Sequence, residues 1–279
     1  MSKYRILLIG WLLGLLGLSG CEQNTPPPPT EKTLVIYSGI TMVRPIQHLA
    51  TMFERQHPGV RVRIKQGASG FLYNTLKVEK KGDLYFPGSD SYRKTHQKDG
   101  LFKNHAFVGY NRLALVVPKG NPKQLTDNPI QLTDSALSVV LASPESGAIG
   151  RNVKTLLDKI DLTEQVYRNV TYFTTDSHRI TTAIKKGHAD VAINWYATTL
   201  WPKNRQQLSG ILLPESLAPK KKLELIRLSF GKHPDLANAF MQLAASQTGL
   251  DVFYRYGFFT EAEYQARTKT LMQTQKATP

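Results

Sequence analysis

The stretch TLVIYSG at residues 33–39 decides how this chain folds. Its first five residues are apolar, aromatic or β-branched and predict a buried strand, and the Ser-Gly pair that follows predicts a turn. A helix is expected next, because apolar side chains recur at helical spacing at Ile46, Leu49, Ala50 and Phe53. A strand, a turn and a helix in this order form the repeating unit of an α/β protein.

The same unit returns along the chain. Residues 60–64 (VRVRI) alternate as a strand, the turn GASG at 67–70 leads into a second helix, and DLYF at 83–86 is a third short strand. Further buried strands are predicted at 112–117, 137–142 and 189–193. Repeated strand and helix units imply parallel sheets, whose ligands bind beyond the carboxyl ends of the strands.

The start of the chain reads as a lipoprotein processing signal. Lys3 and Arg5 precede an apolar run at 6–18, which is shorter than the roughly 20 residues that a membrane-spanning helix needs. The run ends in Leu-Ser-Gly before Cys21, the only cysteine of the chain. We therefore expect residues 1–20 to be a signal peptide that is removed, and Cys21 to carry the lipid anchor.

The residues after the signal lead to the folded part. Residues 21–32 include four consecutive prolines at 26–29, so they are expected to form an extended tether. Since Cys21 is committed to lipid, the exported chain has no cysteine left for a disulfide and relies on packing for its stability.

The charge of the chain favours anionic partners. Lys and Arg number 36 against 21 acidic residues, which gives a formal net charge of +15. A basic chain often binds nucleic acid, but the sequence has no recognition helix, zinc-ligand spacing or aromatic-rich basic motif, so no nucleic-acid partner is expected. The basic runs at 77–81, 119–123 and 220–222 are interpreted as solvated faces.

The segment SPESGAIGR at 143–151 is the sharpest motif. It follows the strand at 137–142 and leads into a predicted helix. Backbone amides at a helix start are free and carry a partial positive charge, so this turn, with Arg151 beside it, predicts an anion site. The alternative is that Ser146 caps the helix and Arg151 lies in solvent.

Two later segments also bear on a site. TTDSHR at 174–179 precedes a helix, and we expect Asp176 to cap it, although a carboxylate in a cleft could also accept a proton from an anion. The strand at 189–193 ends in NWY at 194–196, whose side chains either line a site or pack in the core.

The order of these pieces resembles the type II periplasmic solute-binding proteins, and among them the molybdate-binding family, over nearly the whole mature length. The matching segments are YSG at 37–39, GAS at 67–69, GDL at 82–84, LVVPKGNP at 115–122, ADVAI at 189–193 and FYRYGF at 253–258. The resemblance implies an α/β fold of two lobes, each a mostly parallel sheet flanked by helices, with the ligand in the cleft between the lobes. The implied division is lobe 1 at 33–113 and 223–272, lobe 2 at 114–222, and a C-terminal tail at 273–279.

In that family a tetrahedral oxyanion is held by hydroxyl groups and backbone amides of both lobes. Carried over by position, the resemblance implies contacts from Ser38, Gly39 and Ser69 in the first lobe and from Ser146, Gly147, Ser177 and Tyr196 in the second. The tyrosine match needs one extra residue, since an ungapped count from Asp190 places Trp195 there. Arg151 has no counterpart in the pattern, and in the cleft it would favour a more highly charged anion or a carboxylate.

One segment departs from the molybdate pattern. Residues 82–92 read GDLYFPGSDSY, and the Pro-Gly pair inside it predicts a turn at the cleft edge. We interpret this segment as a surface loop, with Ser89, Ser91 and Tyr92 as alternative ligand contacts.

These features predict a membrane-anchored solute-binding protein and not an enzyme. It would capture a molybdate- or tungstate-like oxyanion and deliver it to the permease of an ABC importer, as an exported monomer facing the periplasm or the extracellular side. Such a site needs only donors, which suits turns rich in Ser, Thr and Gly. No cofactor or metal is expected, and the sequence has neither a Gly-x-Ser-x-Gly elbow nor a phosphate loop to support catalysis.

Several alternatives stay open at this point. The anion could be phosphate, sulfate, a phosphonate or an organic anion, and the lipoprotein could serve sensing or structure without transport. Ferric iron is a further alternative, because the opening at 33–39 also resembles iron-binding relatives. Those relatives use two adjacent tyrosines, whereas this chain has Trp195-Tyr196 at that place.

Overall fold

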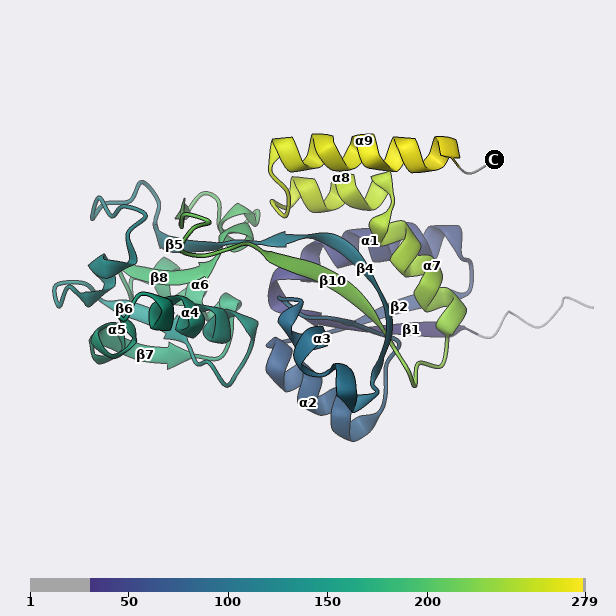
Figure 1. The fold of residues 1–279 in the computed structure, drawn as a ribbon, viewed down its shortest axis with the longest axis horizontal. Helices are drawn as coiled ribbons and strands as arrows, with labels where there is room; N and C mark the ends of the chain where they lie inside the picture. The colour runs from purple at the N-terminus through teal and green to yellow at the C-terminus, as the bar shows by residue number, and fades with distance from the viewer. Residues whose placement is uncertain (1–30, 278–279) are drawn as a thin grey trace, which may run out of the picture. The chain divides into compact units, whose positions relative to one another are not determined.

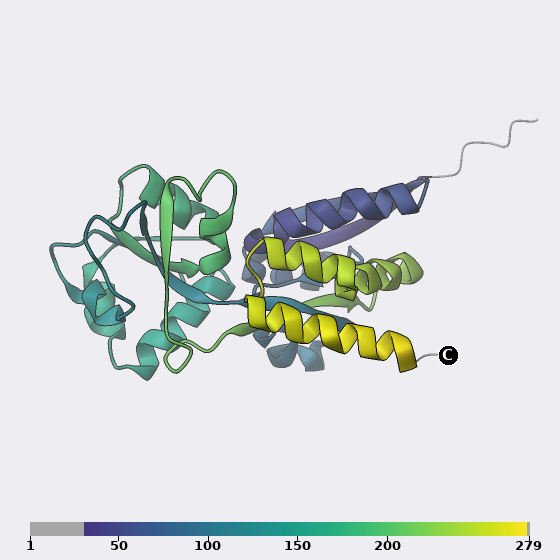
Figure 2. The same cartoon turned by 90° about the horizontal axis from the view of Figure 1, so that it is seen from above.

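The computed structural model of the protein describes residues 31–277. The predicted signal peptide at 1–20, the lipidation site Cys21 and the tether as far as residue 30 lie outside the described residues. The described part builds two five-stranded sheets with helices packed on them (Figure 1 and Figure 2). No helix in this part is long and apolar enough to cross a membrane.

The first sheet has the strand order β2-β1-β3-β10-β4. Its strands are β1 (Lys32–Gly39), β2 (Val60–Gly67), β3 (Leu84–Phe86), β4 (Phe102–Asn111) and β10 (Lys221–Leu228). β1 pairs in parallel with β2 and β3, whereas β10 pairs antiparallel with both β3 and β4. Because β4 opposes β10 and β10 opposes β3, four of the five strands run in one direction.

The second sheet repeats this arrangement in the order β7-β6-β8-β5-β9. Its strands are β5 (Leu113–Pro118), β6 (Val139–Ala142), β7 (Val170–Thr174), β8 (Val191–Trp195) and β9 (Leu208–Leu212). β6 is parallel to β7 and β8, and β5 is antiparallel to β8 and β9. Each sheet with its helices is called a lobe below. The predicted two-lobed α/β fold with mostly parallel sheets is therefore confirmed.

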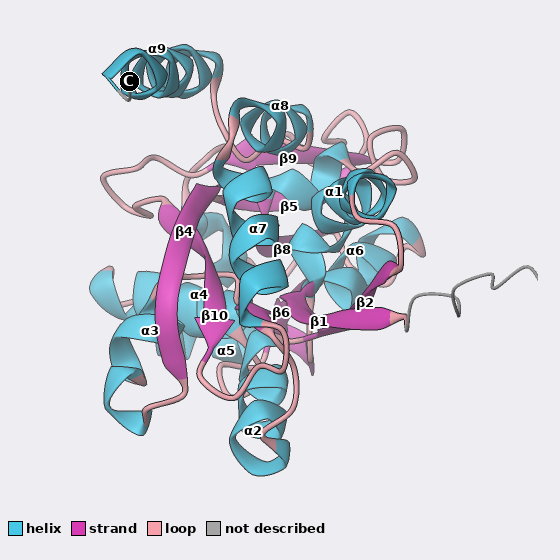
Figure 3. Ribbon diagram, turned by 90° about the vertical axis from the view of Figure 1, so that its right-hand side faces the viewer, coloured by secondary structure: helices cyan, strands magenta, loops and turns pink. Residues whose placement is uncertain are grey.

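Helices cover both faces of the first sheet (Figure 3). One group is α1 (Val43–Gln56), α7 (Pro234–Ala245) and α8 (Gln247–Arg255), and the other is α2 (Ser69–Glu79) and α3 (Ser91–Thr95). Neighbouring strand residues point to opposite groups, since Ile36 packs with the first and Tyr37 with the second. The last helix, α9 (Glu261–Ala277), lies on α8 (Figure 1).

The second lobe is packed by α4 (Ala148–Lys159), α5 (Thr163–Asn169) and α6 (Ser177–Lys185). Leu156 and Leu157 of α4 and Ile180 and Ile184 of α6 are buried in its core. Short 3₁₀ turns complete the fold at Ile40–Met42, Gln97–Asp99, Pro129–Thr133 and Tyr196–Leu200. The first of these turns runs directly into α1, so the helical backbone after β1 begins at Ile40.

The chain changes sheet twice, and these two crossings connect the lobes. It passes from β4 to β5 at Arg112 and returns between Leu212 and Lys221. The predicted boundaries after residues 113 and 222 fall within two residues of the crossings, and they remain a proposal for the extent of each lobe. Part of the predicted tail at 273–279 is helical, because α9 continues to Ala277 through residues of good helix propensity.

An ion-pair cluster joins both crossings to α9. Glu263 accepts hydrogen bonds from Arg112 at the first crossing and from Lys220 at the second, the latter over 2.6 Å to Lys220 Nζ. Glu215 lies 3.7 Å from Arg112 Nε and 3.5 Å from Lys220 Nζ. Burial raises the pKa of Glu263, but the hydrogen bonds from Lys220 and from the Thr260 N–H, with the charge of Arg112, outweigh it and hold that pKa below its usual value.

Candidate functional site

A small cavity lies where helical segments of both lobes begin. Its volume is about 20 Å³, and a space of roughly 10–15 Å³ is needed to hold one water. It lies beyond the carboxyl ends of the parallel strands, as expected for sheets of this kind. The residues around it are Gly39, Ile40, Thr41, Met42, Gly67, Ala68, Ser69, Gly88, Gly147, Ala148, Ile149, Asp176, Ser177 and Trp195.

Two of the helices at the cavity begin without a side-chain cap. Ala68 precedes α2 and Gly147 precedes α4, both with extended backbone, and no described side chain caps either helix. The first hydrogen bonds back to the residues before each helix are donated by Leu72 and Arg151. The backbone N–H groups ahead of them therefore have no partner within their helices, and they surround a space with positive potential.

The helical segment after β1 begins at the same cavity. Gly39 precedes the turn that begins at Ile40, and again no described side chain caps it. Thr41, whose side chain is also a donor, is buried beside the cavity. Three uncapped helical starts, from Ile40, Ser69 and Ala148, thus meet around one space.

The fourth helix differs because Asp176 caps it. Oδ1 of Asp176 accepts hydrogen bonds from the N–H groups of His178, at 2.8 Å, and Arg179, at 3.0 Å. Oδ2 accepts one from Thr175 Oγ1 at 3.1 Å. The predicted cap is confirmed, and the carboxylate that borders the cavity already accepts bonds at both oxygens. Ser177, the first residue of α6, follows it at the cavity.

The predicted site residues divide into two sets. Gly39, Ser69, Gly147 and Ser177 line the cavity, whereas Ser38, Ser146, Arg151 and Tyr196 do not. The hydroxyl of Ser38 is buried and donates to Gly39 O at 3.1 Å. The hydroxyl of Ser146 donates to Ser143 O at 2.8 Å. Both hydroxyls are satisfied locally instead of pointing into the cavity.

The hydrogen bonds that Ser69 accepts leave its hydroxyl proton available. Its Oγ accepts the Gly88 N–H at 3.0 Å, and its carbonyl accepts the Tyr85 hydroxyl at 2.8 Å. With one lone pair of Oγ used in this way, the hydroxyl proton is free to point to a ligand.

Trp195 occupies the place that the resemblance assigned to a tyrosine. It lines the cavity, and its Nε1 lies 3.6 Å from where a Cβ on Gly88 would stand. Tyr196 is the next residue and belongs to a 3₁₀ turn, with its ring against Gly210. The residue that an ungapped count from Asp190 reaches is thus the one that lines the cavity, and its indole N–H is a donor with no acceptor function.

Asn194 positions two of the cavity residues and was missed as such by the sequence reasoning. It is fully buried, its Nδ2 donates to Ser177 O at 3.0 Å, and its Oδ1 accepts the Trp195 N–H at 2.8 Å. The sequence signal was a polar residue at the end of an apolar strand.

The loop after β3 is buried, which corrects the predicted surface loop. Ser89 and Tyr92 are 1% and 0% exposed, and Gly88 lines the cavity. Asn111, at the end of β4, donates from Nδ2 to Gly88 O at 3.0 Å. The loop is therefore held between the first crossing and the cavity, an arrangement that only the long-range pairing of β4 creates.

The lobes meet across the cavity through glycines. A Cβ on Gly147 would lie 3.1 Å from the Cβ of Ala68, and one on Gly70 would lie 2.9 Å from Ser146 O. A Cβ on Gly70 would require the backbone to shift, and one on Gly147 would be tighter than an ordinary contact. The described arrangement is thus a closed one, in which the lobes are in close contact beside the cavity.

Two arginines cross between the lobes to aromatic rings. Arg151 of the second lobe lies over the ring of Tyr92 in the first, with 3.9 Å from its Cζ to the ring centroid. Arg44 of the first lobe lies 5.6 Å from the ring centroid of Trp201 in the second. Burial raises the pKa of Tyr92, and the charge of Arg151 partly opposes this. The guanidinium of Arg151 therefore contacts the opposite lobe and is not among the groups that line the cavity, and its contact with a ligand stays a prediction.

Metal ligation has no support among the described residues. No group of three or more His, Cys, Asp or Glu side chains within residues 31–274 is placed to hold a metal ion.

Comparisons with known proteins agree with this architecture. A sequence profile of the bacterial extracellular solute-binding protein family matches residues 34–259. YvgL of Bacillus subtilis (strain 168), whose name proposes an ABC transporter substrate-binding lipoprotein, is 24% identical over 266 residues, covering 94% of this chain and 100% of that protein.

Two solved structures show the same fold at low identity. The sulfate-binding protein SubI from Mycobacterium tuberculosis H37Rv has a TM-score of 0.73 and 16% identity, over 86% of this chain and 91% of that one. The periplasmic molybdate-binding protein of Azotobacter vinelandii has a TM-score of 0.68 and 15% identity, over 81% and 99%. The family profile spans both sheets and every helical start at the cavity. The chain therefore belongs to the bacterial extracellular solute-binding protein family.

Proposed function

We propose that this solute-binding protein captures a single tetrahedral oxyanion, of the molybdate, tungstate or sulfate kind, in the cavity between its lobes. One observation carries the proposal: three uncapped helical starts and the first residue of α6 surround a space of about 20 Å³. Aligned backbone N–H groups and helix dipoles stabilise negative charge at such a place.

The donor set favours anions without protons. A dehydrated oxyanion offers only acceptors, and the cavity offers backbone N–H groups, hydroxyls and the indole of Trp195. The carboxylate of Asp176 accepts the cap bonds of α6, so it is not poised to take a proton from the ligand. Hydrogen phosphate would set its own O–H against donors, and each buried group left unpaired costs about 1–3 kcal/mol.

The comparisons support the fold on which such a site would be built. A sulfate-binding and a molybdate-binding protein share the fold, although their low identity carries the fold alone and not the ligand. The cavity of about 20 Å³ exceeds the space that one water needs, so a five-atom oxyanion would require the lobes to separate slightly around it.

Delivery to the permease of an ABC importer is the proposed use of the captured ion. The name of YvgL supports both this role and a lipid anchor, which we place on Cys21 of an exported monomer. Ligand that contacts both lobes would favour the closed arrangement, and the closed lobes would be the form that the permease binds. Binding without turnover is the expected activity.

The proposal is tested by calorimetric titration of the purified protein with molybdate, tungstate, sulfate, phosphate and ferric citrate. Ser69→Ala removes a hydroxyl at the cavity, and a charge-assisted hydrogen bond of about 1.5–3 kcal/mol predicts an affinity loss of about 10- to 100-fold. Ser146→Ala is the matched control, because its hydroxyl bonds Ser143 O and does not line the cavity.

Equal losses in the two variants would contradict the assignment of the cavity. Binding of phosphate in preference to sulfate and molybdate would contradict the donor-only argument. No heat and no thermal stabilisation with any of these ions would favour a sensing or structural lipoprotein.

A further inference from the structure

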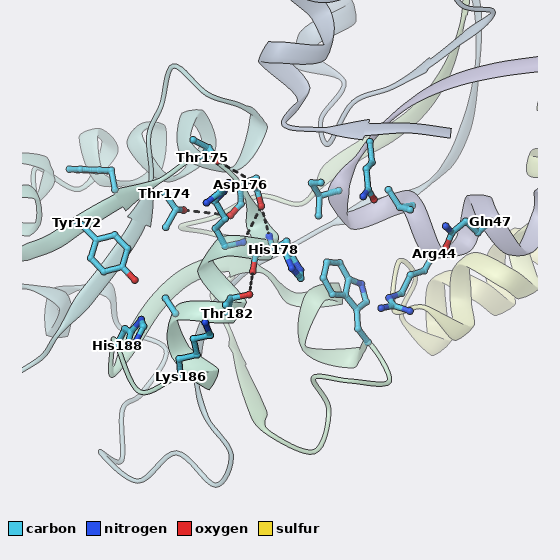
Figure 4. A pocket seen from close by; sticks show the side chains of 17 residues that line it. Arg44, Gln47, Tyr172, Thr174, Thr175, Asp176, His178, Thr182, Lys186 and His188 are labelled. Carbon is cyan, nitrogen blue, oxygen red and sulfur yellow. Dashed lines mark hydrogen bonds and ion pairs between the residues drawn. The ribbon is translucent and has the colours of Figure 1, made fainter. Parts of the chain in front are cut away.

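A wide groove adjoins the small cavity. It has a volume of about 900 Å³ and lies between α1 and β2 of the first lobe and β7 and α6 of the second (Figure 4). Ile40 and Asp176 line both spaces, so the groove opens beside the proposed oxyanion site. An ion of a few atoms would fill the cavity and leave this much larger space unused.

The groove places guanidinium groups next to the cavity. Arg44 follows Ile40 by one helical turn, and Arg179 follows Asp176 by one turn, so each lies on the same side of its helix as a cavity residue. Figure 4 shows Arg44 and Gln47 reaching into the groove from α1, opposite Asp176 and His178. Among the described lining residues Asp176 is the only carboxylate, and it accepts the bonds of the α6 cap.

The walls of the groove also carry exposed aromatic rings and a hydrogen-bond donor without a described partner. Tyr172 and Phe173 of the edge strand β7 are 39% and 42% exposed. The indole N–H of Trp201 is buried and has no hydrogen-bond partner among the described residues. No described carboxylate pairs with Arg44, whose recorded contact is the ring of Trp201. Arg179 Nε lies 3.6 Å from Asp176 Oδ2, but its side chain is 70% exposed, so its guanidinium keeps donors free for a further acceptor. Such cations beside aromatic surface are suited to an acidic organic group.

We propose that the groove is a second subsite, which takes the acidic organic body of a solute whose oxyanion head fills the cavity. The proposal rests on the proposed oxyanion site and deepens it by naming the solute class. That class is an organic sulfonate or phosphate that also carries a carboxylate. Arg44 and Arg179 bind the carboxylate, and the carbon chain between the two acidic groups lies along the walls of the groove.

The test compares two sulfonates that differ in one group. Propane-1-sulfonate carries only the head, whereas 3-sulfopropanoate adds a carboxylate, and inorganic sulfate is the bare ion. Each is titrated calorimetrically into the full chain in detergent at pH 7.5. We expect 3-sulfopropanoate to bind about tenfold more tightly than propane-1-sulfonate.

Arg44→Gln and Arg179→Gln then remove the groove cations one at a time. In each variant the ratio of the two sulfonate affinities is expected to fall towards one, while the affinity for sulfate changes less than about threefold. The ratio is the readout because any effect on lobe closure, such as loss of the Arg44 contact with Trp201, alters both sulfonates alike. Lys123→Gln is the matched control, since it removes one positive charge from an exposed loop outside the groove.

The outcomes separate the two proposals. Tight binding of sulfate with no preference between the sulfonates would overturn the groove subsite and leave the oxyanion site standing. Equal losses of affinity for sulfate and both sulfonates in the arginine variants would mean that the arginines only attract anions through their charge. That result would also overturn the subsite. Failure of all three ions to bind would overturn both proposals.

Discussion

The two sides of the junction between the lobes are held in opposite ways. At the crossings, Arg112 and Lys220 share the carboxylate of Glu263 at hydrogen-bond distance. At the cavity, Gly147 packs on Ala68, and Arg151 lies over the ring of Tyr92. Separating the largely buried ion pairs at the crossings would leave charges without partners. Separating the glycine contact, or moving Arg151 away from the ring of Tyr92, would not leave a buried charge unpaired. From this contrast we expect the lobes to pivot at the crossings and to part at the glycines.

The strongest way to break this comparison is to fill a glycine contact. Gly147→Val adds a side chain where a Cβ already lies 3.1 Å from Ala68 and 3.3 Å from the Ser69 N. The backbone of Gly147 is extended and accepts valine, so the lobes should fold but not close. If the closed state falls to about 1% of the population, calorimetry should show oxyanion affinity reduced by about 100-fold.

Gly147→Ala provides the graded control, because its methyl group requires a shift of only a few tenths of an ångström. We expect its affinity loss to be smaller, near tenfold or below. The unfolding midpoint without ligand should stay close to that of the unaltered protein in both variants. A large drop in that midpoint would mean that Gly147 serves folding and not closure.

The second prediction concerns the crossings. Glu263→Gln removes the carboxylate that Arg112 and Lys220 share, and Arg112 is only 9% exposed. We expect a loss of about 1–2 kcal/mol in the free energy of unfolding, measured by chemical denaturation at pH 7. Glu261→Gln, two residues earlier on the same helix, bonds only within the C-terminal segment and should leave stability unchanged. Oxyanion affinity should hardly change in Glu263→Gln, and a large loss there would place the closing contacts at the crossings.

A smaller effect is expected at the opening side from Arg151→Met. A cation over an aromatic ring contributes about 0.5–2 kcal/mol, so binding should weaken by about 2- to 30-fold through loss of closure. Tyr92→Leu should have a similar effect, and the double variant should show little further loss if the two residues act on each other. Additive losses would mean instead that Arg151 touches the ligand, as the sequence alone suggested.

The smallest expected effect is a difference in how stability depends on pH at the cavity side, through His96, and at the crossings, through Glu263. The ring of His96 stacks on that of Tyr73. Burial lowers the pKa of His96, the charge of Asp99 raises it, and the charge of Arg151 lowers it. The unfolded chain then takes up the proton first, so stability should fall as the pH drops below about 6.5. Glu263 has a lowered pKa, so its stabilisation is present above about pH 4.3 and is lost as the pH falls through its lower folded value.

Unfolding midpoints from pH 8 to pH 3 should therefore show two separate declines. His96→Gln should flatten the upper one, and Glu263→Gln the lower one. If either substitution removes both declines, the crossings and the cavity side do not act independently, and the contrast drawn between them is wrong.

Most of the fold could be predicted from the sequence because its signals are local. The apolar strands, the glycine turns and the helical spacing after them predicted the alternating strands and helices. The two lobes and the contacts at Gly39, Ser69, Gly147 and Ser177 were implied by the resemblance to periplasmic binding proteins, and these four residues do line the cavity. Strand β4 was not indicated, since Lys103, Asn104 and His105 interrupt its apolar pattern and its partner β10 lies far along the chain.

The directions in which side chains point could not be predicted from the sequence. Ser146 and Arg151 stand beside a helix start at the cavity, yet one hydroxyl turns to Ser143 O and the guanidinium turns to Tyr92, which lies far away in sequence. Trp195 and Tyr196 differ by one position, and a shift of one residue at a strand end reverses which side chain faces the site. Position in an element fixes the backbone donors, whereas the direction of a side chain depends on neighbours that only the fold provides.

Strand β10 lies between β3 and β4, although about a hundred residues of the second lobe are synthesised before it. The second sheet is made from one continuous stretch, Leu113 to Leu212, whereas the first stays incomplete until Leu228 has emerged. During export β3 and β4 therefore present unpaired edges, which are sites for aggregation and for chaperones. A chain cut before Lys221 should retain a folded second lobe and expose the first to proteases.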